Sequence, residues 1–343
     1  MDTQSRSYTG AIMLPLRLVT AWLFLSAVLR RLILAPGKHE FQTTQWLGHK
    51  INTFFPHANE PFRSGLDYLL QNPVSLDVFT YVFTFSELLL GLLLAAGFLS
   101  RFTGVFMAGL AIGLMHTAGW LGPTCLDEWQ IASLLVTIGG VMALYGGGRF
   151  SADAWLMRKR PSLEENTWWK LLAFPSFDTR SPRFRKIAVA IPVILVLYVI
   201  ATNQVHHGGV WGPLHNYSKK PGITLSEAAI DDNDTFSFTA FRDKGPEAYG
   251  SFIVEVTIKN SKGQAIHTFN DEFLKQMPSN AIENVYVNKI HTGENSLVIP
   301  LGAKAELTFS VPGPEELRKG KNYTIEMTEI GGRTFTVQTK TTE

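Results

Sequence analysis

Several ionisable side chains lie inside or at the rim of long apolar runs in this sequence, namely Glu87, His116, Cys125, Asp127 and Glu128. A charged side chain at the centre of a membrane costs about 2.5–3.5 kcal/mol on insertion scales, so such groups usually face the interior of a helix bundle. A carboxyl group buried there favours its protonated form and can relay protons. We therefore predict a membrane-embedded site around Glu87 and His116, although an interhelical hydrogen bond would equally explain His116.

Three arginines lie in the first apolar run: Arg17, Arg30 and Arg31. Arg17 and Arg31 are 14 residues apart, close to four helical turns, so they share one helix face and Arg30 points elsewhere. This spacing favours an interior position for Arg31, against the alternative that Arg30 and Arg31 snorkel to the membrane surface. Fixed positive charge attracts small anions, and a guanidinium suits oxyanions. The structural alternative is an ion pair between Arg17 and Glu87 that locks the bundle.

Cys125 is the only cysteine of the chain, which excludes an internal disulfide and a C-x-x-C redox pair. A lone cysteine is commonly a small buried residue. The alternative is a nucleophilic thiolate that a nearby arginine stabilises. Asp127 and Glu128 follow Cys125 closely and oppose ionisation of the thiol unless Arg30 or Arg31 offsets them.

Five apolar runs must position these residues, and each is a candidate to cross a bilayer core of about 30 Å at roughly 1.5 Å per helical residue. They cover residues 11–35, 78–99, 102–122, 129–146 and 187–203. The first run lacks a small-residue cleavage site, so we expect a retained span rather than a signal peptide. Residues 149–186 carry nine Lys or Arg against four acids. By the positive-inside rule, this segment and the N-terminus are expected in the cytoplasm, with the C-terminal part periplasmic, in a multi-pass inner-membrane protein.

In the C-terminal part, apolar residues recur with the period of two that is typical of β-strands. From Thr235 onward, residues alternate or are β-branched in short runs at 236–241, 251–259, 296–300, 305–311, 323–328 and 334–338. Turn signals separate these runs, which predicts seven or eight strands in a β-sandwich with a binding or covering role. The expected fold class is an α-helical membrane bundle, with a four-helix core plus a fifth span, followed by an all-β sandwich-like soluble domain.

The expected domains are a four-span membrane domain at 1–155, a basic cytoplasmic connector at 156–186, a fifth transmembrane span at 187–203 and an extracytoplasmic β domain at 204–343. Two amphipathic pieces, 41–55 and 62–70, are expected on the membrane surface or as a cap of the bundle. After the last span, residues 206–216 form a Gly-rich stretch with paired histidines. Its ligand set is incomplete for a metal, so we interpret it as a junction between membrane and domain.

The composition narrows the function classes. The chain has 343 residues, 45% hydrophobic and 17% charged, with a net charge of +2. No basic patch with interleaved aromatic residues is present, so nucleic acid is not an expected partner. Haem-attachment, zinc-finger, Walker and dinucleotide-binding patterns are missing, so no metal or flavin motif is expected. The lipid bilayer is an expected partner, and a homo-oligomer is compatible with the sequence.

Several segments together resemble thiosulfate:quinone oxidoreductase, as a fusion of its two subunit types, DoxD (within the wider DoxX group) and DoxA. The membrane part is similar to DoxD in Arg17 with Arg31, in the pattern E-x3-G-x5-G-x3-R-x2-G that starts at Glu87, and in GGGRFSAD at 146–153. The later part is similar to DoxA in GGVWGPLHN at 208–216, IENVY at 282–286 and LVIPLGAKA at 297–305. The DoxX-like features indicate the fold better than the activity.

The resemblance implies oxidation of two thiosulfates to tetrathionate, with two electrons passed to membrane quinone as the acceptor. The candidate catalytic residues are Cys125, Glu87 and His116. The candidate substrate-binding residues are Arg30, Arg31, His207, Trp211 and His215. The candidate quinone-binding residues are Glu87, His116, Arg17 and Trp129. Two alternative classes stay open: a sulfur-oxyanion binding or transport protein, and a non-catalytic subunit of a respiratory complex.

Overall fold

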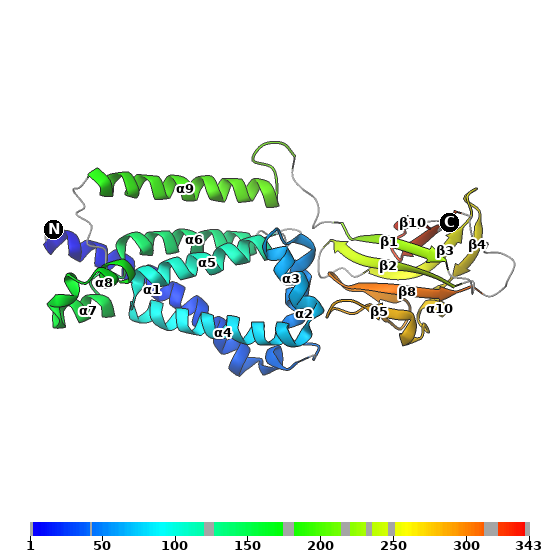
Figure 1. The fold of residues 1–343 in the computed structure, drawn as a ribbon, viewed down its shortest axis with the longest axis horizontal. Helices are drawn as coiled ribbons and strands as arrows, with labels where there is room; N and C mark the ends of the chain where they lie inside the picture. The colour runs from blue at the N-terminus through cyan, green and yellow to red at the C-terminus, as the bar shows by residue number, and fades with distance from the viewer. Residues whose placement is uncertain are drawn as a thin grey trace. The chain divides into compact units, whose positions relative to one another are not determined.

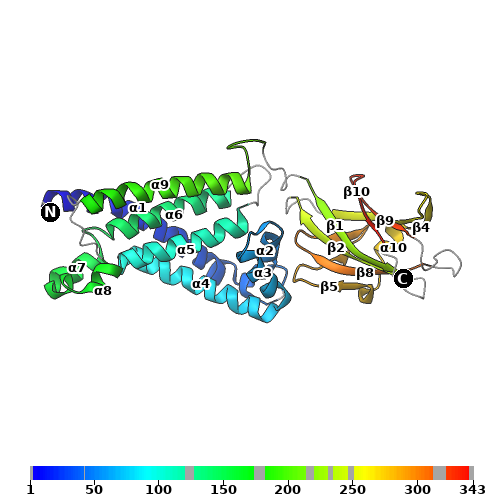
Figure 2. The same ribbon diagram turned by 45° about the horizontal axis from the view of Figure 1, so that its top comes forward.

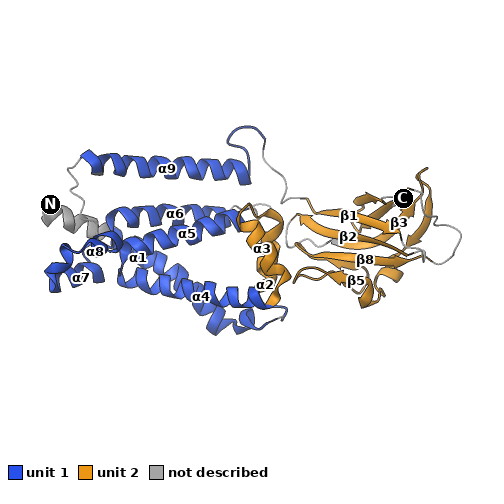
Figure 3. Cartoon of the chain, in the orientation of Figure 1, with its two compact units in different colours: residues 1–47, 74–120, 126–215 blue, residues 48–73, 121–125, 216–343 orange. Residues whose placement is uncertain are grey.

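The computed structural model describes residues 3–41, 43–119, 127–173, 182–213, 220–230, 235–245, 251–311 and 322–339. The chain forms two compact units, which Figure 3 shows in different colours. Unit 1 comprises residues 1–47, 74–120 and 126–215. Unit 2 comprises residues 48–73, 121–125 and 216–343.

Unit 1 is helical (Figures 1 and 2). Its long helices are α1 (Thr3–Leu29), α4 (Pro73–Ala96), α5 (Ser100–Ala118), α6 (Asp127–Tyr145) and α9 (Pro182–His206). Helix α1 is followed by a π-helical turn, Arg30–Leu34. A 3-10 turn, Pro36–His39, comes after the π-helical turn. The short helices α7 (Ala152–Lys159) and α8 (Thr167–Leu172) lie in the basic segment. Pro73 and Pro182 begin α4 and α9, a position that needs no backbone N–H donor.

Four helices of unit 1 are long and apolar enough to cross a membrane: Met13–Leu34, Pro73–Ala96, Glu128–Tyr145 and Arg185–His206. They match four of the five expected runs, which confirms a membrane protein. The last is longer than the expected 187–203, because the helix runs through Pro192 to His206. The remaining expected run, 102–122, corresponds to α5. This helix is not among the four, because Arg101 and the glycines of α5 lower its mean hydropathy.

The bundle packs around α5 and α6, which approach closely where Gly104 faces Gly139. A Cβ atom on Gly104 would lie 2.8 Å from the carbonyl oxygen of Gly139, so only small residues fit there. Leu90, Met107 and Met115 belong to the core of the bundle and are completely buried. Helix α9 contacts α6 where Leu195 lies against Gly140. Another face of α9 exposes apolar side chains, as expected for a helix that faces lipid: Val189, Val193, Ile194, Val196 and Leu197.

Unit 2 contains two antiparallel sheets. One has the strand order β1-β2-β8-β5, and the other has β10-β9-β3-β7-β6 with β4 paired to β3. The strands are β1 (Gly222–Ile230), β2 (Thr235–Lys244), β3 (Ser251–Lys259), β4 (Ala265–Phe269), β5 (Ile282–Asn284), β6 (His291–Thr292), β7 (Leu297–Ile299), β8 (Lys304–Ser310), β9 (Thr324–Glu329) and β10 (Thr334–Gln338); a short helix, α10 (Asp271–Leu274), follows β4. The antiparallel β domain is therefore confirmed.

The six runs named from the sequence are all strands, but the described residues form ten strands rather than seven or eight; β1, β4, β5 and β6 lie outside the named runs. Strand β1 lies before Thr235, where the prediction began. Two register shifts interrupt its pairing with β2, and Glu227 has a positive φ of 54°. These irregularities break the period of two on which the prediction depended.

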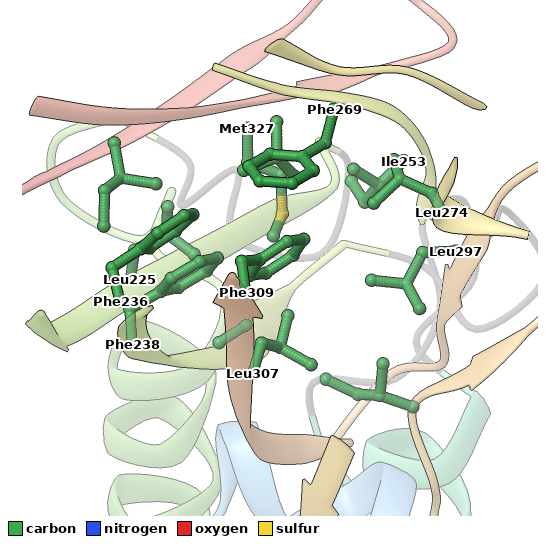
Figure 4. Close-up of a cluster of buried hydrophobic side chains, with 14 of the residues drawn as sticks. Leu225, Phe236, Phe238, Ile253, Phe269, Leu274, Leu297, Leu307, Phe309 and Met327 are labelled. Atoms are coloured by element: carbon green, nitrogen blue, oxygen red, sulfur yellow. The ribbon is translucent and has the colours of Figure 1, made fainter. Parts of the chain in front are cut away.

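One apolar core lies between the two sheets, and Figure 4 shows its stacked rings. Phe236 and Phe238 point inward from β2, and Phe309 points inward from β8. The ring centroids of Phe236 and Phe309 are 5.1 Å apart. Burial of such a side chain contributes roughly 1.5–3 kcal/mol, so this cluster is a main source of stability for the β domain.

Two amphipathic helices belong to unit 2 rather than to the bundle. Helices α2 (Leu47–Phe54) and α3 (Phe62–Gln71) match the expected pieces 41–55 and 62–70. The ring of Phe55, which follows α2, lies 5.2 Å from that of Tyr286 and 6.0 Å from that of Phe241. The apolar face of this segment therefore packs on the β domain, a contact that the sequence did not predict.

Candidate functional site

An ion pair inside unit 1 joins the end of the first span to α4. Arg31 Nη1 donates to Glu87 Oε2 and lies 3.4 Å from Thr84 Oγ1. The Arg31 guanidinium also lies over the ring of Phe83, 5.4 Å from its centroid. Glu87 is 8% exposed, whereas Arg30 is exposed. Arg31 thus points inward, as its helix face predicted, and it neutralises a buried carboxylate.

The backbone that carries Arg31 is π-helical. The N–H of Ala35 donates to the carbonyl of Arg30 at 2.8 Å, which closes a turn one residue wider than an α-helical turn. A π-turn changes the direction of the side chains that follow α1. Such turns occur frequently at functional sites, which makes this end of the span a candidate site.

His39 extends this polar group, and the sequence analysis missed it. Its Nε2 lies 3.1 Å from Thr84 Oγ1, and its Nδ1 lies 3.4 Å from Thr80 Oγ1. Its ring stacks on Tyr81 at 4.5 Å, and the Tyr81 hydroxyl donates to the His39 carbonyl at 3.2 Å. His39 lies in the 3-10 turn Pro36–His39, so no helical spacing relates it to α4. We call Arg31, His39, Thr80, Tyr81, Thr84 and Glu87 the Arg31–Glu87 cluster.

The environment of His39 favours the neutral imidazole. Burial lowers the pKa of His39, and the positive charge of Arg31 lowers it further, while Asp77 opposes both. His39 is 8% exposed, yet each of its ring nitrogens is within hydrogen-bond distance of a threonine hydroxyl. The cluster thus places a proton-exchanging ring one hydroxyl away from the Arg31–Glu87 pair.

A second polar group joins α5, α6 and α9. His116 Nε2 lies 3.0 Å from the Tyr198 hydroxyl, and the rings of His116 and His206 are 5.5 Å apart. Trp129 Nε1 donates to Thr202 Oγ1 at 3.2 Å, and the Trp129 ring contacts His207 edge-on at 5.7 Å. We call this set the His116 cluster: His116, Trp129, Tyr198, Thr202, His206 and His207.

The His116 cluster brings together three candidates from the sequence, His116, Trp129 and His207. The sequence analysis missed their partners on α9. Tyr198, Thr202 and His206 recur every fourth residue, a spacing that places them on one helix face. That polar stripe within an apolar span was the signal that could have found them.

Arg17 has a different environment. It is 2% exposed, its Nη1 donates to the carbonyl of Gly147 at 2.7 Å, and its Nη2 donates to that of Phe150 at 2.8 Å. Asp153, in the same segment, accepts from the backbone N–H of Leu99 at 2.8 Å. The expected alternative of an Arg17–Glu87 pair is therefore wrong, because Glu87 pairs with Arg31. Arg17 instead holds the segment after α6 against α1.

Substitution of Arg17 by Met is expected to destabilise the protein rather than to weaken quinone binding. The carbonyl groups of Gly147 and Phe150 would lose a charged donor, and each such hydrogen bond contributes about 1.5–3 kcal/mol. The midpoint of thermal unfolding in detergent should fall, while the KM for quinone of the folded fraction stays unchanged. Arg183→Met, at an exposed arginine, is the control for loss of charge. A raised quinone KM at unchanged stability would contradict this structural role.

The remaining candidates are distributed as follows. Arg30 and Trp211 are exposed, the latter by 61%. Cys125 and His215 lie outside the described residues, so their roles stay predictions. The structure therefore offers two polar groups in the bundle, the Arg31–Glu87 cluster and the His116 cluster, as sites for chemistry.

Comparison with known proteins identifies two family models on this chain. The model "TQO small subunit DoxD" matches residues 12–177, and the model "TQO small subunit DoxA" matches residues 206–338. Both clusters contain residues of the DoxD match, while His206 and His207 lie at the start of the DoxA match. Helix α9 thus carries most of the 28 residues, 178–205, that separate the two matches.

Among solved structures, a chain of the archaellum periplasmic stator protein complex FlaF and FlaG from Sulfolobus acidocaldarius is 13% identical. The match covers 37% of this chain and 96% of that chain, with a TM-score of 0.23. A chain of TarS from S. aureus is 9% identical over 70% of this chain and 64% of that chain, with a TM-score of 0.19. At these TM-scores, neither similarity bears on the function.

Proposed function

The chain belongs to the DoxD and DoxA families of thiosulfate:quinone oxidoreductase small subunits, fused in one polypeptide, and from this premise we propose the reaction that it catalyses. Two thiosulfate dianions are oxidised to one tetrathionate dianion, and one membrane quinone takes up the two electrons and two protons to become a quinol. The match of both families on a single chain is the observation that carries the proposal. The same proposal places the N-terminus in the cytoplasm and the β domain outside an inner membrane.

Arg30 and Arg31 are proposed to attract thiosulfate. A small dianion needs fixed positive charge near a low-dielectric region, and guanidinium groups supply it. Arg30 is exposed and free to make the first encounter. Arg31 already pairs with Glu87, so thiosulfate at Arg31 competes with the carboxylate. That competition would let Glu87 take up a proton as the substrate binds, and His207, Trp211 and His215 stay further candidate contacts.

Quinone reduction is proposed to use Glu87 and His116 as proton-exchanging groups, with Trp129 beside His116. A quinone site needs an apolar slot and a few donors for the carbonyl oxygens, and both clusters lie among apolar helices. We no longer propose Arg17 as a quinone-binding residue, because its guanidinium already donates to backbone carbonyls of the segment that follows α6. His39 is added as a positioning residue that exchanges protons near Glu87 through Thr84.

A covalent route through Cys125 is part of the proposal. The Cys125 thiolate and one thiosulfate form an S–S bond, giving a cysteinyl thiosulfonate, and the two electrons released reduce quinone with uptake of two protons. The sulfane sulfur of a second thiosulfate then attacks the sulfane sulfur of the adduct. Tetrathionate leaves, and the cysteine departs as a thiolate, ready for the next cycle.

Substitution of His39 by Gln is expected to lower kcat at least about tenfold and to change its pH profile. Because the pKa of His39 is lowered, its charged form appears only below the ordinary histidine pKa of about 6.5. The kcat of the unmodified protein should therefore rise as pH falls through that region, as the proton-carrying form becomes populated. Arg31 and Asp77 are the charged groups that act on His39, and the Tyr81 ring stacks on it.

The measurement is kcat at saturating thiosulfate and quinone between about pH 4.5 and 7.5, a window that extends well below the ordinary histidine pKa of about 6.5. His291→Gln, at an exposed histidine of the β domain, is the matched control and should retain the profile. If His39→Gln keeps the pH dependence of the unmodified protein, His39 does not carry the proton. A Gln side chain keeps hydrogen-bonding capacity, so a purely structural role would leave the pH profile unchanged.

The activity is tested by anaerobic turnover of the detergent-purified protein with thiosulfate and a soluble quinone analogue. Quinone absorbance and tetrathionate are followed together, and one tetrathionate per quinol is the expected stoichiometry. Thiosulfate binding without electron transfer would overturn the proposal in favour of a binding or transport protein, which uptake into proteoliposomes would then test. Neither binding nor turnover would favour a non-catalytic subunit.

A further inference from the structure

The two family matches meet inside one compact unit. Residues 48–73 lie within the DoxD match, and residues 216–338 lie within the DoxA match. Figure 3 shows both segments in the colour of unit 2. A part of the DoxD sequence therefore belongs to the same compact unit as the DoxA domain. We call residues 48–73, which include α2 and α3, the α2–α3 segment.

Buried amides of the α2–α3 segment bind backbone groups of the β domain. Asn52 is completely buried; its Nδ2 donates to the carbonyl of Gly302 at 2.9 Å, and its Oδ1 accepts from the N–H of Asn288 at 2.8 Å. The side chain of Asn288 in turn lies 2.9 Å from His49 Nδ1 and donates to the His49 carbonyl at 3.3 Å. Asn52 therefore binds backbone groups of the β domain, and Asn288 binds a backbone group of the α2–α3 segment. Such directional hydrogen bonds fix the relative position of the two parts in addition to holding them together.

A second contact lies at α3. The Tyr286 hydroxyl donates to Asp67 Oδ1 at 2.6 Å, and Tyr286 is 7% exposed. Burial raises the pKa of Tyr286, and the Asp67 carboxylate raises it further, so the hydroxyl remains a donor. Phe55 packs against the Tyr286 ring, and the Arg63 guanidinium lies 5.4 Å from the centroid of the Phe55 ring. An apolar anchor with a polar rim is typical of a specific protein interface.

Gly302 shows that the β domain is shaped for this contact. It has a positive φ of 79°, which favours glycine, and a Cβ atom there would lie 2.6 Å from Asn52 Nδ2. Gly302 and Tyr286 both lie in segments that resemble DoxA, 297–305 and 282–286. These characteristic segments therefore serve the contact with the α2–α3 segment.

We propose that the α2–α3 segment is a docking surface for a DoxA-type β domain and holds it without a covalent connection. The occupant of this surface is the chain's own DoxA-type domain, which meets it through Tyr286, Asn288 and Gly302. In this protein, fusion raises the effective concentration of the domain at a site that already binds it. The inference is independent of the redox chemistry.

The test cuts the connection in the full-length protein. A protease site inserted between Gly212 and Pro213, which are exposed, separates the chain into a membrane part and a β domain. After complete cleavage in detergent, both parts are expected to co-purify through a C-terminal affinity tag and to co-elute in size exclusion. Separation of the two parts under these conditions would overturn the proposal.

Matched variants locate the surface. Asn52→Leu leaves the Gly302 carbonyl and the Asn288 N–H without their partner, and Asp67→Ala removes the acceptor of Tyr286. Each is expected to speed dissociation of the cut complex at least about tenfold. Glu272→Ala removes a carboxylate of an exposed ion pair with Lys275 and should leave dissociation unchanged.

Amide hydrogen exchange of β2, β8 and β9 in the uncut variants verifies that the β domain stays folded. If the core strands keep their protection and dissociation is unchanged in both Asn52→Leu and Asp67→Ala, the docking surface lies elsewhere and the proposal fails. If the strands lose protection, charge-conserving Asp67→Glu replaces Asp67→Ala. Its longer side chain displaces the acceptor of Tyr286 and must still weaken the complex for the proposal to stand.

Discussion

Glu87→Gln is expected to lower kcat for quinone reduction by about 10²–10⁴-fold, the range for loss of a general acid or base. Glu87 is the buried carboxylate of the Arg31–Glu87 cluster, and glutamine has nearly its shape but takes up no proton. The measurement is steady-state turnover with thiosulfate and a quinone analogue, together with the KM of each substrate. A variant that keeps half of the original kcat would remove Glu87 from the mechanism.

Stability measurements distinguish a structural role of the Arg31–Glu87 ion pair from a role in proton exchange. Removal of one partner of a buried pair costs about 3–5 kcal/mol, whereas replacement of both by apolar residues is often neutral or stabilising. Arg31→Met and Glu87→Leu should each lower the unfolding midpoint, and the double variant should recover it. We expect the double variant to remain inactive, because the charge that attracts thiosulfate and the group that exchanges protons are both lost. Recovery of activity with stability would show that the pair is only structural.

Cys125→Ser is expected to lower turnover more than about 100-fold, since a serine hydroxyl at neutral pH supplies no comparable nucleophile for the S–S bond. The covalent route also predicts a stable intermediate. With thiosulfate and one equivalent of quinone, intact-protein mass spectrometry should detect an adduct of one thiosulfate on Cys125. Addition of excess thiosulfate should remove the adduct and release tetrathionate.

The conservative control for Cys125 is Ser133→Ala, which removes a hydroxyl from α6 that donates to the Trp129 carbonyl at 2.7 Å. Its turnover should stay within about threefold of the unmodified protein, since one such hydrogen bond contributes about 0.5–1.5 kcal/mol. Full turnover of Cys125→Ser would exclude the covalent route and leave direct electron transfer from thiosulfate to quinone. The Glu87 prediction would stand in that case, because it concerns the protons of quinone reduction.

We propose that the two clusters share the chemistry, with thiosulfate at Arg31 and the protons of quinone reduction exchanged by Glu87 and His116, and these variants test that assignment. The Arg31–Glu87 cluster combines positive charge with groups that exchange protons, as a site for an anionic substrate requires. The His116 cluster combines imidazole, phenol and indole groups among apolar helices, as a quinone site requires. Variants of Arg31 should therefore change the KM for thiosulfate, and variants of Tyr198 or Trp129 should change the KM for quinone.

The apolar runs and the regular strands could be predicted from the sequence, because both depend on local period. Four of five expected spans recur as apolar helices, and β3 and β10 have the expected bounds. The inward direction of Arg31 followed from its spacing to Arg17, which is a property of one helix. The family resemblance rested likewise on short contiguous segments such as 208–216.

Only the tertiary structure decided which groups meet. Arg17 and Arg31 share a helix face, but the partner of each lies far along the chain, at 147–150 for one and at Glu87 for the other. His39 follows the span in an irregular turn, so no period places it beside Thr84. The α2–α3 segment has the amphipathic pattern of a surface helix, and that pattern shows an apolar face without showing its partner. Local sequence determines which face is apolar or charged, whereas the pairing of faces depends on long-range packing that no local period encodes.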